Sequence, residues 1–152
     1  MAIASPFCTK AEVRLIAPEL TAANLSDENL DLIIAEADKD LIMEVGGCMD
    51  LVAVYALTAI PSELNRMSTM LSRAYAYKYY YGDKRITESD EDLYHYWLVK
   101  YNELIRMLCE GQIVFHDSTG AVVSPFTYSV SKTKSKKFFG TDNFDQYDSD
   151  DD

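Results

Sequence analysis

The chain has 152 residues, of which 48% are hydrophobic, so it is long and apolar enough for one domain with a core. Its 14 basic and 25 acidic residues give a formal net charge of −11, which argues against tight binding to nucleic acid, since such binding depends on neutralising phosphates. No membrane helix is expected, because the longest apolar stretch, Leu51–Ile60, has about half of the roughly 20 residues required. Residues 1–10 lack the features of a signal peptide.

Two helices are predicted in the first third of the chain. Thr9 and Glu12 have the spacing of a capping box, and the short helix that they begin must end before Pro18. Ser26 is a good N-cap for a second helix, which Gly46-Gly47 ends. Its apolar face is expected to hold Leu30, Ile33, Ile34, Ala37, Leu41 and Val45, and its opposite, charged face Asp31, Glu36, Asp38, Lys39 and Asp40.

Residues 48–60 stay ambiguous, because a short apolar run suits a buried strand or the start of a helix equally well. Beyond them, two longer helices are predicted over 61–110. Pro61 suits the first turn of one helix, Gly82 ends it, and the next begins near Thr87 and ends at Gly111. The short loop between them predicts an antiparallel αα-hairpin. The inner face of its second helix would be Leu93, Trp97, Leu104 and Leu108, flanked by Tyr94, Leu98, Tyr101 and Ile105.

An aromatic cluster is expected within this αα-hairpin. Tyr75 and Tyr79 should lie near Tyr96 and Trp97 across the two helices. A cluster of this kind can stack nucleic-acid bases, but only when a basic groove surrounds it. The sequence favours packing in the core or between subunits instead.

After Gly111 the helical pattern ends. Residues 112–115 and 121–123 flank a turn-like Asp117–Gly120, which predicts a short β-hairpin. Residues 131–137 carry four Lys and no acid, whereas residues 138–152 carry six Asp and no Lys or Arg. The predicted fold is therefore mainly α: a helical domain over 1–111, a β-hairpin and connection over 112–130, and an extended charged C-terminal arm over 131–152.

Nothing in the sequence indicates catalysis, a metal or a cofactor. His95 and His116 lack metal-ligand spacing, and Gly46-Gly47 follows a helix instead of preceding one, so it does not cradle phosphate. The acidic run 90–92 is ordinary for a helix N-terminus. The three cysteines, Cys8, Cys48 and Cys109, are widely spaced without a CxxC pair, which predicts reduced thiols in a cytosolic protein.

The C-terminal region is the most informative segment for function. Composition alone would favour a solvated tail, but aromatic residues are interleaved with its charges: Phe126, Tyr128, Phe138, Phe139, Phe144 and Tyr147. Fixing about 20 residues costs roughly 20–40 kcal/mol, whereas burying six aromatic side chains returns about 9–18 kcal/mol. Ordering the arm would therefore require backbone pairing as well, such as strand addition to a neighbour's sheet. We expect the arm to be an assembly device that orders on a partner.

The sequence resembles the head–tail connector (adaptor) proteins of tailed bacteriophages. The resemblance is carried by residues 20–37 (LTAANLSDENLDLIIAEA), and by Pro61-Ser-Glu-Leu64 leading into residues 71–77 (LSRAYAY). It covers about residues 9–110 and implies a structural protein without enzymatic activity. Such adaptors form a ring, usually of twelve copies, beneath the portal protein in the virion neck, where they extend the DNA channel and provide a platform for the stopper or tail proteins.

Carried over to this chain, the resemblance implies that the arm reaches the portal, after assembly in the host cytoplasm. The portal-facing residues would be Lys132, Lys134, Lys136, Lys137, Phe138, Phe139, Phe144 and Tyr147. Double-stranded DNA would pass an acidic lumen without specific binding. An alternative is a small acidic binding protein, such as a DNA mimic or regulator, that blocks a basic protein surface. A cell-wall hydrolase is a third possibility, for which the chain offers no convincing carboxylate pair.

Overall fold

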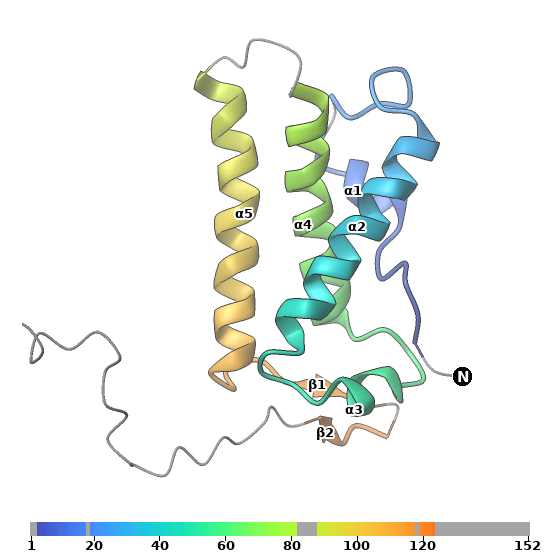
Figure 1. The fold of residues 1–152 in the computed structure, drawn as a ribbon, viewed down its shortest axis with the longest axis vertical. Helices are drawn as coiled ribbons and strands as arrows, with labels where there is room; N and C mark the ends of the chain where they lie inside the picture. The colour runs from blue at the N-terminus through green and yellow to red at the C-terminus, as the bar shows by residue number, and fades with distance from the viewer. Residues whose placement is uncertain (1–2, 18, 82–87, 118, 124–152) are drawn as a thin grey trace, which may run out of the picture.

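The computed structural model describes residues 3–17, 19–81, 88–117 and 119–123 and confirms a mainly helical fold with one small antiparallel sheet (Figure 1). The helices are α1 (Lys10–Arg14), α2 (Asp27–Val45), α3 (Leu51–Tyr55), α4 (Ser62–Tyr81) and α5 (Glu88–Cys109), and the strands are β1 (Phe115–His116) and β2 (Val122–Val123). The arm predicted at 131–152 lies outside the described residues.

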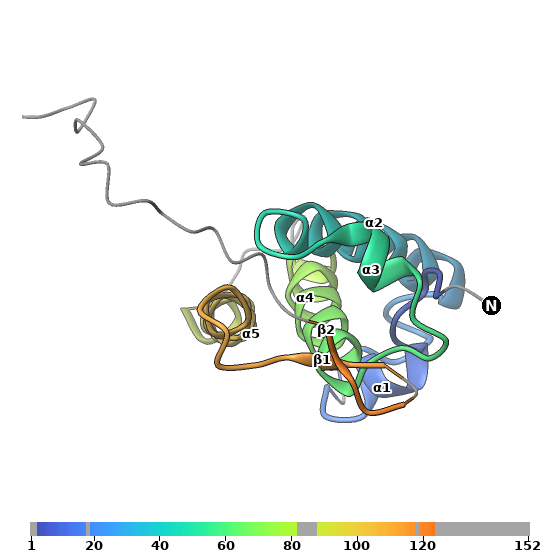
Figure 2. The same ribbon diagram turned by 90° about the horizontal axis from the view of Figure 1, so that it is seen from below.

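Helix α4 is the central element of the fold. Helices α1, α2 and α5 all pack against it, and Figure 2, the view from below, shows them arranged around its axis. The predicted apolar positions Leu64, Met67, Leu71 and Ala74 are buried, and every position from 67 to 74 is buried too, including Ser68, Thr69, Ser72 and Arg73. A helix that is covered on nearly all sides fixes the positions of the others.

The predicted helix ends are confirmed at α1 and α2. Thr9 and Glu12 form the capping box: the Thr9 hydroxyl accepts from the Glu12 amide, and the Glu12 carboxylate accepts from the Thr9 amide at 2.6 Å. Ser26 caps α2 by accepting from the Asn29 amide at 3.2 Å, and Gly46 is the C-cap. Pro61 precedes α4 instead of lying in its first turn, and its carbonyl accepts the first bond of the helix, from Asn65.

The ambiguous segment 48–60 contains a helix of a single turn, α3. The Asp50 carboxylate accepts from the Val52 amide at 2.9 Å, which caps the turn. Within α3 only Val54 is buried, and Val52 is 78% exposed. The high apolar content of this run therefore does not reflect a buried strand, because much of it faces solvent.

The αα-hairpin is confirmed, with α4 and α5 antiparallel and in extensive contact (Figure 1). The inner face of α5 differs in one respect from the expected one. Tyr101, expected at its flank, is 1% exposed and lies deeper than Leu93 and Leu104, which are half-buried. Trp97 and Leu108 are buried as predicted.

The predicted β-hairpin is also confirmed. Phe115 pairs with Val123 and His116 with Val122 in an antiparallel ladder. Its turn is held by the Asp117 carboxylate, which accepts from the amides of Thr119 and Ala121. The Thr119 hydroxyl also donates to this carboxylate, at 2.6 Å. This bond has the largest effect in lowering the pKa of Asp117, and the bonds from the amides lower it further. Gly120 has φ +82°, which explains glycine at this position.

The prediction of three reduced thiols is wrong. Cys48 and Cys109 form a disulfide with their Cα atoms 5.1 Å apart, and Cys8 alone is free and buried. The bridge joins the loop after α2 to the last residue of α5, across 61 residues of sequence. Spacing in sequence could not predict it, because the αα-hairpin and its packing on α2 bring the two cysteines together.

Candidate interaction surfaces

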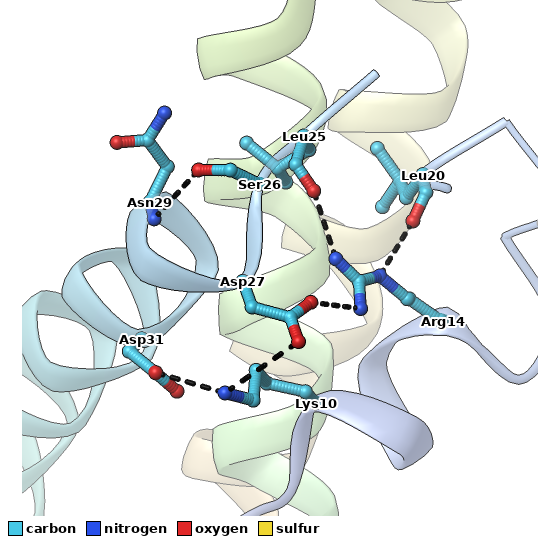
Figure 3. Close-up of polar contacts among 8 residues, drawn as sticks. All are labelled: Lys10, Arg14, Leu20, Leu25, Ser26, Asp27, Asn29 and Asp31. Carbon is cyan, nitrogen blue, oxygen red and sulfur yellow. Dashed lines mark hydrogen bonds and ion pairs between the residues drawn. The ribbon is translucent and has the colours of Figure 1, made fainter. Parts of the chain in front are cut away.

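The corner between α1 and α2 is fixed by two basic side chains (Figure 3). Arg14 donates to the carbonyls of Leu20 and Leu25, both at 2.8 Å, and to the Asp27 carboxylate at 2.6 Å. Lys10 donates to Asp31 at 2.9 Å. The hydrogen bond from Arg14 lowers the pKa of Asp27, and the bond to Asp31 raises the pKa of Lys10. These contacts hold the connecting loop in place, so this corner is structural.

Asp38 is buried, which corrects its predicted place on the charged, solvent-facing side of α2. It is 1% exposed, and its carboxylate accepts from the Phe7 amide at 2.8 Å, from the Ser5 hydroxyl at 2.7 Å and from the Ser68 hydroxyl. The reason is helical spacing, because residue 38 follows Ile34 by four positions and therefore shares its buried face. Asp38 ties the N-terminal segment to α2 and α4.

Arg73 is a second buried charged group, 7% exposed in α4. Its guanidinium donates to the carbonyls of Val13 at 3.0 Å and Glu12 at 2.5 Å, at the C-terminal end of α1, where helical carbonyls lack part of their intrahelical bonding. It also lies 4.7 Å from the centre of the Trp97 ring, a cation–π contact. Burial is the main cause that lowers the pKa of Arg73. One side chain thus connects α1, α4 and α5.

The four aromatic residues predicted to cluster lie at different places. Tyr96 and Trp97 are in contact, with ring centres 5.0 Å apart, but Trp97 points to Arg73 in the core whereas Tyr96 is 52% exposed. Tyr75 is half-buried and donates to the Asp40 carboxylate of α2 at 2.6 Å. Burial, followed by this bond, raises the pKa of Tyr75. Tyr79 is 57% exposed, so the exposed pair Tyr79 and Tyr96 is available for contacts with other chains.

Helix α5 packs mainly against α4 and only slightly against α2. Its outer surface exposes Tyr96 and Val99, which is 62% exposed. Within the described part of the chain, the buried Trp97 Nε1 has no hydrogen-bond partner. Burial, and then the charge of Glu44, raise the pKa of Tyr101.

A groove of about 570 Å³ lies between α4, α5 and the segment that leads into β1. The apolar side chains that line it include Met70, Leu104, Met107 and Ile113. The charged and polar residues around it are Glu63, Arg66, Lys100, Glu103, Gln112 and His116. Its size is in the range that receives large side chains of a ligand or partner.

The exposed surface of α2 is strongly acidic. Its exposed acidic residues are Asp27, Glu28, Asp31, Glu36 and Glu44. Of these, Asp27 and Asp31 are paired with basic side chains of α1. The equivalent acidic positions predicted at 88–92 of α5 have side chains outside the described residues.

No group of three or more His, Cys, Asp or Glu residues that could hold a metal occurs within the described ranges. His95 and His116 are both exposed, and His116 borders the groove. Of the helices in the described part of the chain, none is both long and apolar enough to cross a bilayer. The arm residues predicted to face a portal, Lys132 to Phe139 with Phe144 and Tyr147, lie outside the described residues.

Comparison of the chain with known protein families, with curated proteins and with solved structures finds no match.

Proposed function

We propose that this protein is a head–tail adaptor of a tailed-phage virion. It acts as a structural ring subunit, with no enzymatic activity and no cofactor. Copies of the chain form a ring beneath the portal, which extends the DNA channel and receives the stopper or tail proteins. Double-stranded DNA passes the acidic surface without being bound, because like charges repel.

The observation that carries the proposal is the order of the elements. The elements follow one another in the same order as in the adaptors. They are a short capped helix, a helix capped by Ser26, a helix after Pro61 with tyrosines at its end, an antiparallel partner helix and a charged C-terminal segment. The exposed Tyr79, Tyr96 and Val99 support it further, because an oligomer would cover such side chains.

The proposal assigns the arm, residues 131–152, to the portal. Its lysines, Lys132, Lys134, Lys136 and Lys137, would pair with acidic groups of the portal, and Phe138 and Phe139 would insert between them. Phe144 and Tyr147 would make the further contacts. The body of the protein, residues 1–130, holds 19 acidic and 10 basic residues. Its net negative charge would suit the wall of a channel through which DNA passes.

A deletion tests this assignment. The chain without residues 131–152 is expected to keep the helical circular dichroism spectrum of the full chain, because the buried core of the described residues extends from Ile3 to Phe115. It is also expected to lose co-elution with purified portal rings in size-exclusion chromatography. A variant with Lys39→Ala and Lys78→Ala, two exposed lysines of the body, is the control and should co-elute normally. Unchanged co-elution of the deleted chain would refute the assignment.

The net charge of −11 and the acidic face of α2 favour one other function, that of an acidic mimic that blocks a basic protein. Electron microscopy separates the two. A ring of high symmetry with the portal supports the adaptor, whereas a small stoichiometric complex with a basic enzyme supports the mimic.

A further inference from the structure

Within the described residues the sheet has two strands, so β1 and β2 each have an outer edge without a strand partner, and the outer edge of β1 borders the groove. The Asp117 amide donates to the Ala121 carbonyl at 2.9 Å. Asp117 and Ala121 are therefore a hydrogen-bonded pair. Such pairs alternate with non-bonded ones along an antiparallel ladder, so His116–Val122 is a non-bonded pair and Phe115–Val123 is again a bonded one. The backbone groups of residues 114 and 116 therefore point away from β2.

Val114 and His116 are also residues that line the groove. Within the described part of the chain, their backbone amides and carbonyls make no backbone hydrogen bond in a turn, loop or cap. Figure 2 shows β1 running from the end of α5 across the end of α4, the two helices that form the other walls. An unpaired strand edge beside an apolar groove is the arrangement that accepts an added strand with large side chains.

The groove can accommodate aromatic side chains. Met70 and Met107, one from each helix, line it with flexible and polarisable groups that adapt to the shape of a ring. Leu104 and Ile113 complete the apolar lining. Glu63 and Glu103 lie at the same groove together with Arg66 and Lys100, so its rim carries charges of both signs.

The chain itself contains a segment that fits. Residues 126–130 read Phe-Thr-Tyr-Ser-Val, in which apolar and hydroxyl side chains alternate. This period of two predicts a strand with one apolar face, and five residues is a usual strand length. Paired with the open edge, such a strand would direct Phe126, Tyr128 and Val130 to one side and Thr127 and Ser129 to the other.

The segment cannot reach the open edge of its own β1. Val123 ends β2, which occupies the opposite edge, and only Ser124 and Pro125 separate it from Phe126. A strand on the open edge that runs antiparallel to β1 would be parallel to β2, and parallel strands need a connection of about a dozen residues. A strand on the open edge that runs parallel to β1 is excluded as well, because the two residues Ser124 and Pro125 are too few to take the chain from β2 past β1 to its far edge. The strand must come from another copy.

We propose that residues 126–130 of one copy pair with the open edge of β1 in a second copy and place Phe126 and Tyr128 in its groove. This inference rests on the proposed function and supplies the contact between neighbouring subunits. Each copy offers one strand and one groove, so the contact is head-to-tail and repeats until a ring closes. The arm at 131–152 remains available for the portal, and a chain without it keeps the self-association.

A mixing experiment with full-length chains tests the head-to-tail contact. The strand variant carries Phe126→Ala and Tyr128→Ala, and the groove variant carries Met107→Glu. Each is expected to associate at least about tenfold more weakly than the wild type in sedimentation velocity. An equimolar mixture of the two is expected to form dimers, because one intact strand meets one intact groove. The matched control, Thr127→Ala with Ser129→Ala, should assemble as the wild type does.

Three results would overturn the proposal: a wild-type chain that is monomeric at every concentration, a strand variant that assembles normally, or a mixture that remains monomeric although both variants fold. Circular dichroism checks folding. Should Met107→Glu not fold, the strand variant and its control decide the question. If the chain assembles through a different surface and still docks on the portal, only the strand pairing is contradicted. If the expected mixing pattern is found but the chain does not dock on the portal, only the adaptor function is contradicted.

Discussion

At the scale of single residues, two charged groups lie within the otherwise hydrophobic core of the described residues. Asp38 and Arg73 are both almost fully buried. Each is satisfied by hydrogen bonds and not by an opposite charge, since Asp38 accepts from a backbone amide and two hydroxyls and Arg73 donates to two carbonyls. Buried charges are tolerated when their hydrogen-bonding capacity is used in this way.

We predict that Asp38→Ala lowers the free energy of unfolding by about 3 kcal/mol. The substitution leaves a buried amide and two hydroxyl groups without their acceptor, and bonds to charged groups contribute about 1.5–3 kcal/mol each. Urea denaturation measures the change. Glu36→Ala, at an exposed position of the same helix, is the control and should stay within about 0.5 kcal/mol of the wild type. Equal effects of the two would show that the Asp38 network contributes nothing.

Glu12 makes the stability depend on pH. The bond from the Thr9 amide is the main cause that lowers the pKa of Glu12 below its ordinary value of 4.5. A lowered pKa in the folded state stabilises the fold above pH 4.5, and this contribution is lost as the pH falls through the folded value. Glu12→Gln should therefore be less stable than the wild type at pH 7 and about equally stable near pH 3, as urea midpoints can show. A difference that persists unchanged at pH 3 would contradict this.

At the scale of elements, α5 is held to the rest of the fold by packing, a disulfide and a cation–π contact. It packs mainly on α4, and the Cys48–Cys109 disulfide joins its end to the loop after α2. Arg73 is the other link, through the ring of Trp97. The position of the β-hairpin follows from these links, because it begins directly after α5.

Reduction of the disulfide is predicted to cost about 4 kcal/mol of unfolding free energy, since the bridge closes a loop of 61 residues in the unfolded chain. Thermal melts with and without dithiothreitol measure the loss, and Cys48→Ser should melt at the same temperature in both. Thiol titration in denaturant checks the bond directly. One free thiol, that of Cys8, is expected before reduction and three after it. Three thiols without a reductant would contradict the bridge.

At the scale of the whole molecule, the sequence predicted whatever depends on neighbours in the chain. The capping box of Thr9, the N-cap Ser26 and the turn at Asp117 are local, and the structure confirms each. The disulfide and the contacts of Arg73 depend on packing between distant segments, which no spacing reveals. Asp38 was predictable, because its four-residue distance from Ile34 places it on the apolar face.

The candidate surfaces were predicted less well than the fold. The four aromatic residues were expected to form one cluster, in the core or between subunits. Instead Trp97 is buried beside Arg73, Tyr75 is bonded to α2, and Tyr79 and Tyr96 are exposed. The groove was not predicted, because it requires side chains from α4, α5 and the segment before β1 to converge. The segment that we propose to occupy the groove is 126–130, where apolar and hydroxyl side chains alternate. This alternation is visible only when every second residue is compared.

The central claim is that the chain couples other chains through its C-terminal region and works as a ring. Electron microscopy of the full-length protein mixed with its portal tests this most directly. The account predicts a closed ring of this chain stacked coaxially on the portal, with density from the body of each copy continuing into the groove of the next. Single copies bound at scattered sites, or a portal that remains bare at saturating concentrations of the chain, would contradict it.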